Sequence, residues 1–359
     1  MINAAILGAT GVIGQELIIA LQNHPWYEIT KIAASKRSAG KEYKNAITDE
    51  EGSLSWYCDE YPSDEILNMK VEEVSEFDAK SVDVIFTALE SDVSKSVEPK
   101  LAKIRPVIST ASAFRHEKDV PILIPGINSE HSKILNDQKK RRGWEGFIAP
   151  IPNCTTTGLV ITLKPMLDRF GLNIVLMTSL QALSGSGRNP GVRGLDIIDN
   201  VIPFIPEEEY KVQKETLKIL GKYENGKILP ADVKVSCTCT RINVKDGHTE
   251  SVFTSTKKES NIDTVKEAMS EYDGGLKTMR LPSSPNNLIV VNSDNYRPQP
   301  RFDRQIDDGM ATIVGRIRSD SALSNGIKYV LFSHNTKMGG AKGAVLVAEM
   351  LTKQEFIKE

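Results

Sequence analysis

The sequence predicts an α/β protein, with a doubly wound parallel sheet followed by an α+β domain whose mixed sheet is largely antiparallel. In the first half, short apolar runs alternate with amphipathic stretches, as in successive βα units. From about residue 173 onward, longer strand-like runs alternate in polarity, which suits a sheet with one covered face. A chain of 359 residues is also long enough for two domains.

The individual elements follow from these patterns. An apolar run over residues 4–7 predicts a buried strand, and Ile13, Leu17 and Leu21 recur every four residues in a helix predicted over 11–24. Further strands are predicted over 29–34, 82–89, 107–109, 173–183, 233–244, 249–256, 288–291, 311–318 and 329–333. Further helices are predicted over 159–163, 195–201, 208–220, 264–272 and 343–353.

The last predicted helix is expected to pack back on the first domain. We therefore expect residues 1–153 and about 337–359 to form one domain, and residues 154–336 to form a second, catalytic and dimerisation domain. A net charge of -2 gives no reason to expect nucleic acid or an anionic membrane as a partner. No apolar run approaches the ~20 residues that span a bilayer. Four cysteines are too few for a disulfide scaffold, so a cytoplasmic location is expected.

A glycine-rich turn joins the first predicted strand to the first predicted helix. It reads Gly8-Ala9-Thr10-Gly11-Val12-Ile13-Gly14, with the spacing GxxGxxG rather than the commoner GxGxxG. Glycines let backbone N–H groups approach a pyrophosphate at the positive end of a helix. Between a strand and a helix, this turn predicts a Rossmann-like dinucleotide-binding domain. The expected cofactor contacts are Gly8, Thr10, Gly11, Val12, Ile13 and Gly14.

The end of the second predicted strand indicates which dinucleotide binds. An NAD site usually has an acidic residue there, which holds the ribose 2′-hydroxyl. Here the strand runs into Ser35-Lys36-Arg37-Ser38, two hydroxyls and two cations without a carboxylate. These four side chains suit a 2′-phosphate, so NADP is the predicted cofactor.

Cys154 is the predicted nucleophile. It lies in the segment Pro152-Asn153-Cys154-Thr155-Thr156-Thr157-Gly158, between a short apolar run and a predicted helix. A helix N-terminus stabilises a thiolate, whereas an unperturbed thiol of pKa ~8.5 is only a few per cent ionised at neutral pH. Cys237 and Cys239 lack a second pair of ligands at zinc spacing, and Cys58 lies in a polar stretch, so no metal site is expected.

A cysteine nucleophile needs a proton acceptor, and the sequence contains five histidines. His248 follows Asp246-Gly247, a predicted turn between two strand-like runs, and Arg241 lies seven residues earlier. This segment is expected to bring an imidazole and a guanidinium to one end of the second sheet. As an ordinary turn residue, His248 would have no catalytic role, and that alternative stays open from the local sequence alone.

Three segments in this order carry a family resemblance: the strand with GATGVIG, then PNCTTTG, then RINVKDGH. Together they resemble aspartate-semialdehyde dehydrogenase of the archaeal and fungal branch. The segment Gln181-Ala182-Leu183-Ser184-Gly185-Ser186-Gly187, the run Asp199-Asn200-Val201-Ile202-Pro203 and His334-Asn335-Thr336 add to the resemblance, which extends from residue 1 to about 350.

The resemblance implies a reaction and a role for each catalytic residue. A thiolate attacks the acyl phosphate of 4-phospho-L-aspartate, and NADPH reduces the resulting thioacyl enzyme to L-aspartate 4-semialdehyde, in lysine, threonine and methionine biosynthesis. Cys154 would be the nucleophile, His248 the acid/base, and Gln181 would orient the thioacyl group.

The resemblance also implies binding residues. Arg241 would grip the substrate α-carboxylate, a bidentate task suited to guanidinium. Glu208 and Lys211 match a Glu-x-x-Lys pair for the amino group and the phosphate, although the run Glu207-Glu208-Glu209 leaves the choice of glutamate open. The other implied contacts are Arg115 and Asn153 for substrate, and Ser184, Gly185, Gly187 and Asn335 for cofactor.

Two rival functions remain open. Malonyl-CoA reductase shares the thioacyl chemistry and resembles the same branch, but Asn153, Glu208 and Lys211 favour an amino-acid substrate. A non-catalytic NADP-binding redox sensor would bind the cofactor without turnover. The expected partners are the small substrate and a second copy of the chain, as a homodimer or homotetramer.

Overall fold

The computed structural model describes residues 1–49, 51–187 and 194–359, and the chain divides into two compact units. The first unit comprises Met1–Leu123, Ser132–Ile151 and Ala341–Glu359, and the second comprises Ile124–His131 and Pro152–Gly340. The sequence had placed residues 124–131 with the first domain. They group with the second unit, where the Tyr272 hydroxyl donates to the Gly126 carbonyl oxygen over 2.9 Å.

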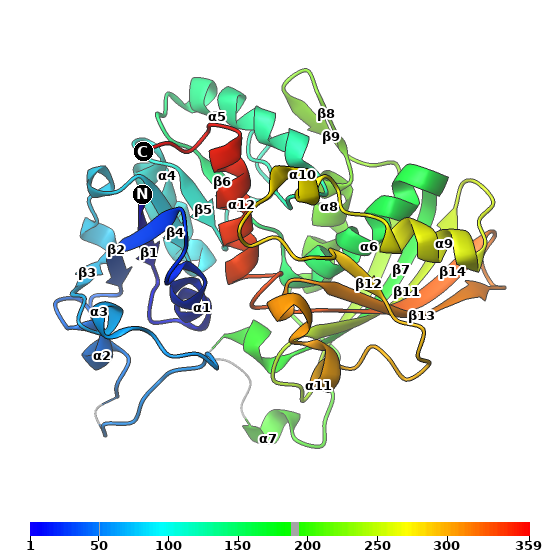
Figure 1. Ribbon diagram of the computed structural model, residues 1–359, viewed down its shortest axis with the longest axis horizontal. Coiled ribbons are helices and arrows are strands. Elements are labelled where there is room, and N and C mark those ends of the chain that lie inside the picture. The colour runs from blue at the N-terminus through cyan, green and yellow to red at the C-terminus, as the bar shows by residue number, and fades with distance from the viewer. Residues whose placement is uncertain (50, 188–193) are drawn as a thin grey trace. The chain divides into compact units, whose positions relative to one another are not determined.

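The first unit is built on a six-stranded sheet with strand order β3-β2-β1-β4-β5-β6, and every pair in it is parallel (Figure 1). This order is that of doubly wound dinucleotide-binding folds, so the predicted fold class is confirmed. The strands are β1 (Ile2–Leu7), β2 (Tyr27–Ala34), β3 (Val71–Glu73), β4 (Val84–Thr87), β5 (Val107–Ser109) and β6 (Ile148–Pro150). The helices are α1 (Val12–Leu21), α2 (Tyr43–Ala46), α3 (Asp64–Leu67), α4 (Ser91–Ala102), α5 (Ile134–Arg142) and α12 (Ala341–Lys353).

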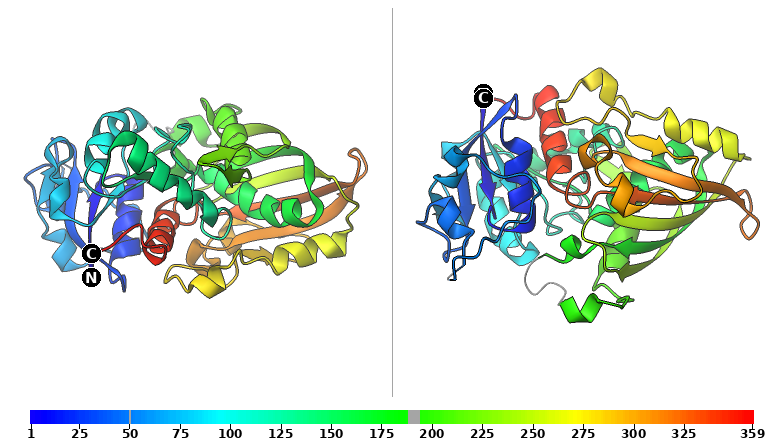
Figure 2. Two further views of the ribbon diagram at one scale, coloured as in Figure 1. Left: turned by 90° about the horizontal axis from the view of Figure 1, so that it is seen from above. Right: turned by 60° about the horizontal axis from the view of Figure 1, so that its bottom comes forward.

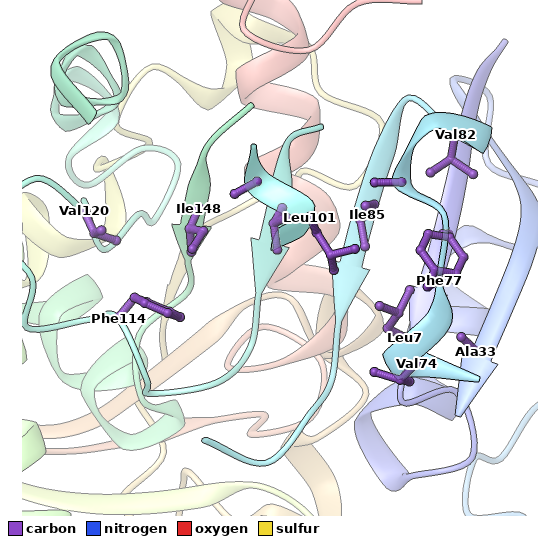
Figure 3. Packing of buried hydrophobic residues seen from close by; sticks show 14 residues of the cluster. Leu7, Ala33, Val74, Phe77, Val82, Ile85, Leu101, Phe114, Val120 and Ile148 are labelled. Carbon is purple, nitrogen blue, oxygen red and sulfur yellow. The ribbon is translucent and has the colours of Figure 1, made fainter. Parts of the chain in front are cut away.

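A hydrophobic cluster fills one side of this parallel sheet (Figure 3). Leu7 of β1, Ile85 of β4 and Ile148 of β6 are fully buried in it, and Leu101 of α4 packs against them. Full burial of such a side chain contributes about 1.5–3 kcal/mol, so the cluster fixes the strands whose ends carry the predicted cofactor residues. The C-terminal helix α12 packs on α1 within this unit.

The second unit contains a mixed six-stranded sheet with strand order β10-β7-β11-β14-β13-β12 (Figures 1 and 2). The two outer pairs are parallel and the three inner pairs are antiparallel, which confirms the predicted mixed sheet. The strands are β7 (Leu172–Gln181), β10 (Lys234–Arg241), β11 (His248–Thr256), β12 (Ile289–Val291), β13 (Thr312–Asp320) and β14 (Gly326–Ser333), beside a hairpin of β8 (Lys222–Glu224) and β9 (Lys227–Leu229). The helices are α6 (Cys154–Phe170), α7 (Gly194–Ile197), α8 (Glu208–Ile219), α9 (Ile262–Ser270), α10 (Leu276–Met279) and α11 (Pro300–Asp303).

Helix α6 packs on one face of this sheet, against β7, β11 and β14, and α8 packs on β10. The register aligns Arg241 of β10 with Gln181 of β7, and His248 of β11 with Ser333 of β14. These side chains therefore gather at one end of the covered face. On the opposite face of the sheet, the alternate β7 residues Leu176, Thr178 and Leu180 are exposed.

Some elements differ from the prediction. The helix predicted over 195–201 is only the short α7, and β3, β6 and α4 were not predicted. Strands of three residues give no periodic signal, and α4 is polar along most of its length. None of the described helices is both long and apolar enough to cross a membrane.

Candidate active site

Cys154 is the first residue of α6, and Asn153 caps that helix. The Asn153 side-chain oxygen accepts hydrogen bonds from the backbone N–H groups of Thr155, over 2.8 Å, and Thr156, over 3.2 Å. The backbone carbonyl oxygen of Asn153 accepts a hydrogen bond from the backbone N–H of Thr157 over 2.9 Å. The cap fixes the first turn, so the sulfur of Cys154 lies at the positive end of a 17-residue helix, where a thiolate is stabilised.

His248 is the first residue of β11, and its Nε2 lies 3.1 Å from the sulfur of Cys154. The other ring nitrogen, Nδ1, accepts a hydrogen bond from the backbone N–H of Ala182 over 3.0 Å. A neutral imidazole in this setting must carry its proton on Nε2, so the ring donates toward the sulfur. Burial lowers the pKa of His248 to about 3, with help from the nearby Arg241 and His334, so the ring is neutral at ordinary pH.

The turn before His248 is held by Asn335. Its side-chain oxygen accepts from the N–H of Gly247 over 2.7 Å, and its side-chain nitrogen donates to the Ser184 hydroxyl over 2.9 Å. Gly185 lies against the same ring, since a Cβ there would be 3.2 Å from Cε1 of His248. The structure thus brings Ser184, Gly185 and Asn335 next to the cysteine–histidine pair, while Gly187 lies further along with a φ of +68°.

Gln181 and Glu208 complete a buried cluster beside the nucleophile. Oε1 of Glu208 accepts from the side-chain nitrogens of Asn153, over 2.9 Å, and Gln181, over 2.8 Å. The Gln181 nitrogen also donates to the hydroxyl oxygen of Thr155. One carboxylate therefore links the cap of the nucleophile helix to the inner face of the sheet.

The three consecutive glutamates at the start of α8 point in different directions. Glu207, whose φ of +58° is left-handed, forms a 3.5 Å ion pair with Lys211. Glu208 points into the buried cluster, and Oε1 of Glu209 accepts from the backbone N–H of Cys239 over 3.1 Å. Of the three, Glu208 is the one whose carboxylate lies beside the nucleophile, a choice that the sequence left open.

Arg241 lies at the end of β10 and is only 6% exposed. Its Nη1 donates to the carbonyl oxygen of Ala182 over 2.7 Å, and its backbone pairs with that of Ile202. Burial lowers the pKa of the guanidinium, and the charges of Cys154 and Glu208 oppose that effect. A buried guanidinium near the nucleophile is suited to bind a carboxylate of a small substrate.

In the first unit, the glycine-rich turn before α1 is tight and has no room for a side chain at Gly14. Gly8 has a left-handed φ of +87°, and a Cβ on Gly14 would overlap the Gly8 carbonyl oxygen. Helix α1 begins after Gly11 without a side-chain cap and without an acidic residue in its first turn. Its first residues, Val12 and Ile13, therefore leave the positive helix end available to an anion.

The segment after β2, in which the sequence predicted the contacts to a 2′-phosphate, exposes two cations and buries the Ser38 side chain. Ser35, Lys36 and Arg37 are exposed, and the backbone N–H of Ser38 donates to the carbonyl oxygen of Ser35 over 2.8 Å in a tight turn. No carboxylate occurs among residues 35–41, and the turn presents two cations, although Glu73 of β3 pairs with Ala34 directly before it. These residues fit NADP better than NAD.

Arg115, the predicted phosphate ligand, lies in the first unit after β5, and its Nη2 donates to the carbonyl oxygen of Thr110 over 2.9 Å. Sequence reasoning missed the buried Glu98 of α4, whose Oε1 accepts from the hydroxyls of Thr87 and Ser109, each over 2.7 Å. Burial raises the pKa of Glu98. This carboxyl thus links the ends of β4 and β5, next to the segment that carries Arg115.

Sequence reasoning also missed Glu215, whose carboxylate contacts the backbone of Asn153. A usable signal was present, since Glu215 follows Glu208 by seven residues, or two turns, on a predicted helix. Cys237 and Cys239 are buried on the covered side of β10. Over the described ranges, no three His, Cys, Asp or Glu side chains are grouped to hold a metal ion.

The chain is similar to known proteins over nearly its whole length. The family model for the NAD binding domain of semialdehyde dehydrogenase matches residues 3–135, and the model for the semialdehyde dehydrogenase dimerisation domain matches residues 163–338. A solved structure of aspartate semialdehyde dehydrogenase with NADP from Candida albicans superposes with a TM-score of 0.88 at 37% identity, covering 99% of this chain and 100% of that chain.

Two curated relatives represent the two enzymes that the sequence had suggested. The aspartate-semialdehyde dehydrogenase of Methanothermobacter thermautotrophicus is 44% identical over 353 residues, 98% of this chain and 99% of that protein. The malonyl CoA reductase (NADP) of Metallosphaera sedula is 34% identical over 361 residues, 99% of this chain and 98% of that protein.

Proposed function

This chain belongs to the semialdehyde dehydrogenase family, and we propose that it is an NADP-dependent aspartate-semialdehyde dehydrogenase. The observation that carries the proposal is the 3.1 Å approach of His248 Nε2 to the Cys154 sulfur at a capped helix N-terminus. The reaction is the reductive dephosphorylation of 4-phospho-L-aspartate to L-aspartate 4-semialdehyde, a step in the biosynthesis of lysine, threonine and methionine.

The first chemical step is acyl transfer to sulfur. The Cys154 thiolate attacks the acyl carbon, a C–S bond forms, and the C–O bond to phosphate breaks as phosphate leaves with the electron pair. His248 presents its Nε2–H to the sulfur, and the same donor stabilises the oxygen that becomes negative during attack. The side-chain amide of Gln181, buried beside Thr155, is positioned to orient the thioacyl group.

The second step returns the enzyme to its starting state. When bound, NADPH supplies the hydride that reduces the thioacyl group to the aldehyde. Cleavage of the C–S bond then regenerates the thiolate of Cys154 without a proton transfer at sulfur. His248 was expected to act as acid/base; with Nδ1 accepting from Ala182, we propose that it acts mainly as a hydrogen-bond donor. The glycine-rich turn and the Ser35–Ser38 segment would hold the cofactor.

The buried charges support an amino-acid substrate. Arg241 would hold the α-carboxylate, and Glu208, buried beside Asn153 and Gln181, would hold the α-ammonium group. Arg115 and Lys211 would contact the phosphate. Malonyl-CoA has no ammonium group for the Glu208 carboxylate, which makes malonyl-CoA reductase the weaker alternative.

We also propose that the chain works as a homodimer or homotetramer in the cytoplasm. It contains the family's dimerisation domain, and the face of the second sheet opposite α6 exposes Leu176 and Leu180. A second copy that packs on this face would bury both side chains. Size-exclusion chromatography with light scattering tests this: Leu176→Asp with Leu180→Asp should shift the protein toward a monomer. All four cysteines lie among the described residues, and none of them forms a disulfide bond there, as suits a reducing compartment.

The function is tested by phosphate-dependent reduction of NADP with L-aspartate 4-semialdehyde, beside a Cys154→Ser control. The expected result is turnover that requires phosphate and falls by at least about 10³-fold in the variant, while NADP still binds. Turnover of malonyl-CoA with NADPH, and none with the semialdehyde, would contradict the proposed substrate. NADP binding without turnover of either substrate would favour the redox-sensor alternative.

A further inference from the structure

We propose that Glu215, a residue outside the substrate cluster, is a positioning residue that sets the orientation of Cys154 through the backbone of Asn153. The inference rests on the proposed function in two respects, namely that Cys154 is the nucleophile and that Glu208 binds the substrate ammonium group. Glu215 lies in the middle of α8 and is fully buried. Its Oε2 accepts a hydrogen bond from the backbone N–H of Asn153 over 2.6 Å.

Asn153 is held by α8 at two points. Glu208 accepts from its side-chain nitrogen over 2.9 Å, and Glu215 accepts from its backbone nitrogen over 2.6 Å. The two glutamates are seven residues apart, so they lie on one face of the helix, two turns apart. Since Asn153 caps α6 with its side chain, fixing its backbone and its amide together fixes the whole cap.

The two carboxylates are not equivalent. Glu208 also accepts from Gln181 and lies in the cluster proposed to bind the substrate ammonium group, so its contacts change when substrate binds. Glu215 is 0% exposed, and its carboxylate accepts a hydrogen bond from the backbone N–H of Asn153. A bond from a carboxylate to a backbone N–H is among the stronger hydrogen bonds in proteins, and a buried one is protected from competition by water. Glu215 can therefore hold Asn153 in place throughout the reaction cycle.

The residue that Glu215 fixes directly precedes Cys154. Rotation of the Asn153 backbone would move the sulfur relative to His248 Nε2, which lies at 3.1 Å, and relative to the helix axis. Both contacts favour the thiolate, and both depend on direction. Misplacement of a reacting atom by about 1 Å can cost about 10²-fold in rate.

The test compares Glu215→Ala, Glu215→Gln and a matched control, Glu209→Ala. Glu209 lies on the same helix and also accepts from a backbone N–H, but that of Cys239 in β10, over 3.1 Å. The direct readout is the rate of iodoacetamide alkylation of the Cys154 peptide against pH, resolved by mass spectrometry without substrate. Steady-state kinetics and thermal unfolding are measured beside it.

For Glu215→Ala we expect kcat to fall about 10–100-fold, with KM for NADP within about 2-fold of the wild type. The alkylation profile of Cys154 should move to higher pH. Glu215→Gln keeps an oxygen acceptor and should recover most of both losses. Glu209→Ala should lose comparable thermal stability while keeping the wild-type kcat and alkylation profile.

Three results would overturn the proposal. One is an alkylation profile in Glu215→Ala that matches the wild type, and another is equal kinetic loss in Glu209→Ala. The third is a Glu215→Gln variant as impaired as Glu215→Ala, which would make charge rather than the hydrogen bond responsible. If Glu215→Ala does not fold, Glu215→Met replaces it, because methionine keeps most of the side-chain bulk in the buried position but cannot accept the hydrogen bond from Asn153. The comparison with Glu215→Gln and Glu209→Ala is then made on alkylation, which requires no catalytic turnover.

Discussion

Two helix N-termini of this chain, those of α1 and α6, differ in how their backbone donors are satisfied. Helix α1 follows Gly11, has no side-chain cap and has no acid in its first turn. Helix α6 follows Asn153, whose side chain accepts two backbone N–H groups and whose own backbone is held by Glu215. Both helix N-termini carry the positive end of a helix dipole. Only at α6 do side chains of the protein accept hydrogen bonds from the backbone N–H groups there.

The difference corresponds to the two kinds of anion that we propose for these ends. A cofactor pyrophosphate brings its own oxygen acceptors, so α1 benefits from an end without a side-chain cap. A thiolate is a single charged atom that must be aimed at one carbon, so α6 benefits from a rigid cap. One helix start is arranged to receive a ligand, and the other to orient a side chain of its own.

Gly14→Ala should have the largest effect on this comparison. A Cβ at position 14 would overlap the Gly8 carbonyl oxygen, so the turn before α1 must open. We expect NADP affinity, measured by fluorescence titration, to fall at least about 100-fold, while Cys154 alkylation stays normal. In Gly11→Ala the new Cβ would be 3.5 Å from the same oxygen. That variant should therefore fold normally and bind NADP more tightly than Gly14→Ala does. Equal losses in the two variants would contradict the steric explanation.

Lys36→Ala with Arg37→Ala should weaken NADP binding by about 10–100-fold, because two charge-assisted contacts to the 2′-phosphate are lost. NAD affinity should stay unchanged, since NAD has no such phosphate. Isothermal titration with both dinucleotides measures the ratio directly. Lys41→Ala removes an exposed cation from the same connection and should leave the ratio as it was. A parallel loss of NAD affinity would assign these side chains to the fold rather than to the phosphate.

Stability should depend on pH through His248. Its pKa falls from an ordinary 6.5 to about 3 on folding, so below pH 6.5 the unfolded chain binds a proton that the folded chain excludes. The free energy of unfolding is therefore unaffected by this group above pH 6.5. It decreases as pH falls, by about 2 kcal/mol at pH 5 relative to pH above 6.5. Urea unfolding of the wild type between pH 7 and pH 5 should show a steeper loss than unfolding of His248→Asn. Parallel curves would mean that the ring protonates freely in the folded protein.

Asn153→Ala should have the smallest effect on stability, a loss of about 1 kcal/mol, as for other N-cap deletions. Asn261→Ala is its natural partner, because Asn261 caps α9 by accepting from the N–H of Thr264 over 2.9 Å. Both variants should lose similar free energy of unfolding, but only Asn153→Ala should slow the alkylation of Cys154. Slower alkylation in both would show that the reactivity follows general stability rather than this cap.

The sequence was most informative where a local pattern sets the structure. The strand, the turn around Gly8 and the helix that follows are determined by residues within about twenty positions of one another, and all three were predicted. Cys154 at the start of a helix was predicted for the same reason. Short strands such as β3 and β6 could not be predicted, because three residues pair only when their neighbours are already in place.

The contacts around the nucleophile depend on tertiary structure. The sequence could suggest Cys154, His248 and Gln181, but not that the Ala182 N–H selects the tautomer of the His248 ring. That contact joins residues 66 positions apart, across two strands whose register no local pattern reveals. Glu98 and Glu215 were missed because an acidic residue on a helix is usually solvated, and only packing shows that these two are buried.

The Glu207–Glu209 run at the start of α8 limits how the chain can change in length. One acid pairs with Lys211, the next enters the buried cluster and the third binds the backbone of β10. A helix turns by about 100° per residue. One inserted or deleted residue within this run would therefore rotate the carboxylates away from their present partners. The hairpin of β8 and β9, whose residues are exposed or partly exposed, carries no such constraint. Libraries of length variants should accordingly tolerate changes at the hairpin turn and reject them at residues 207–209.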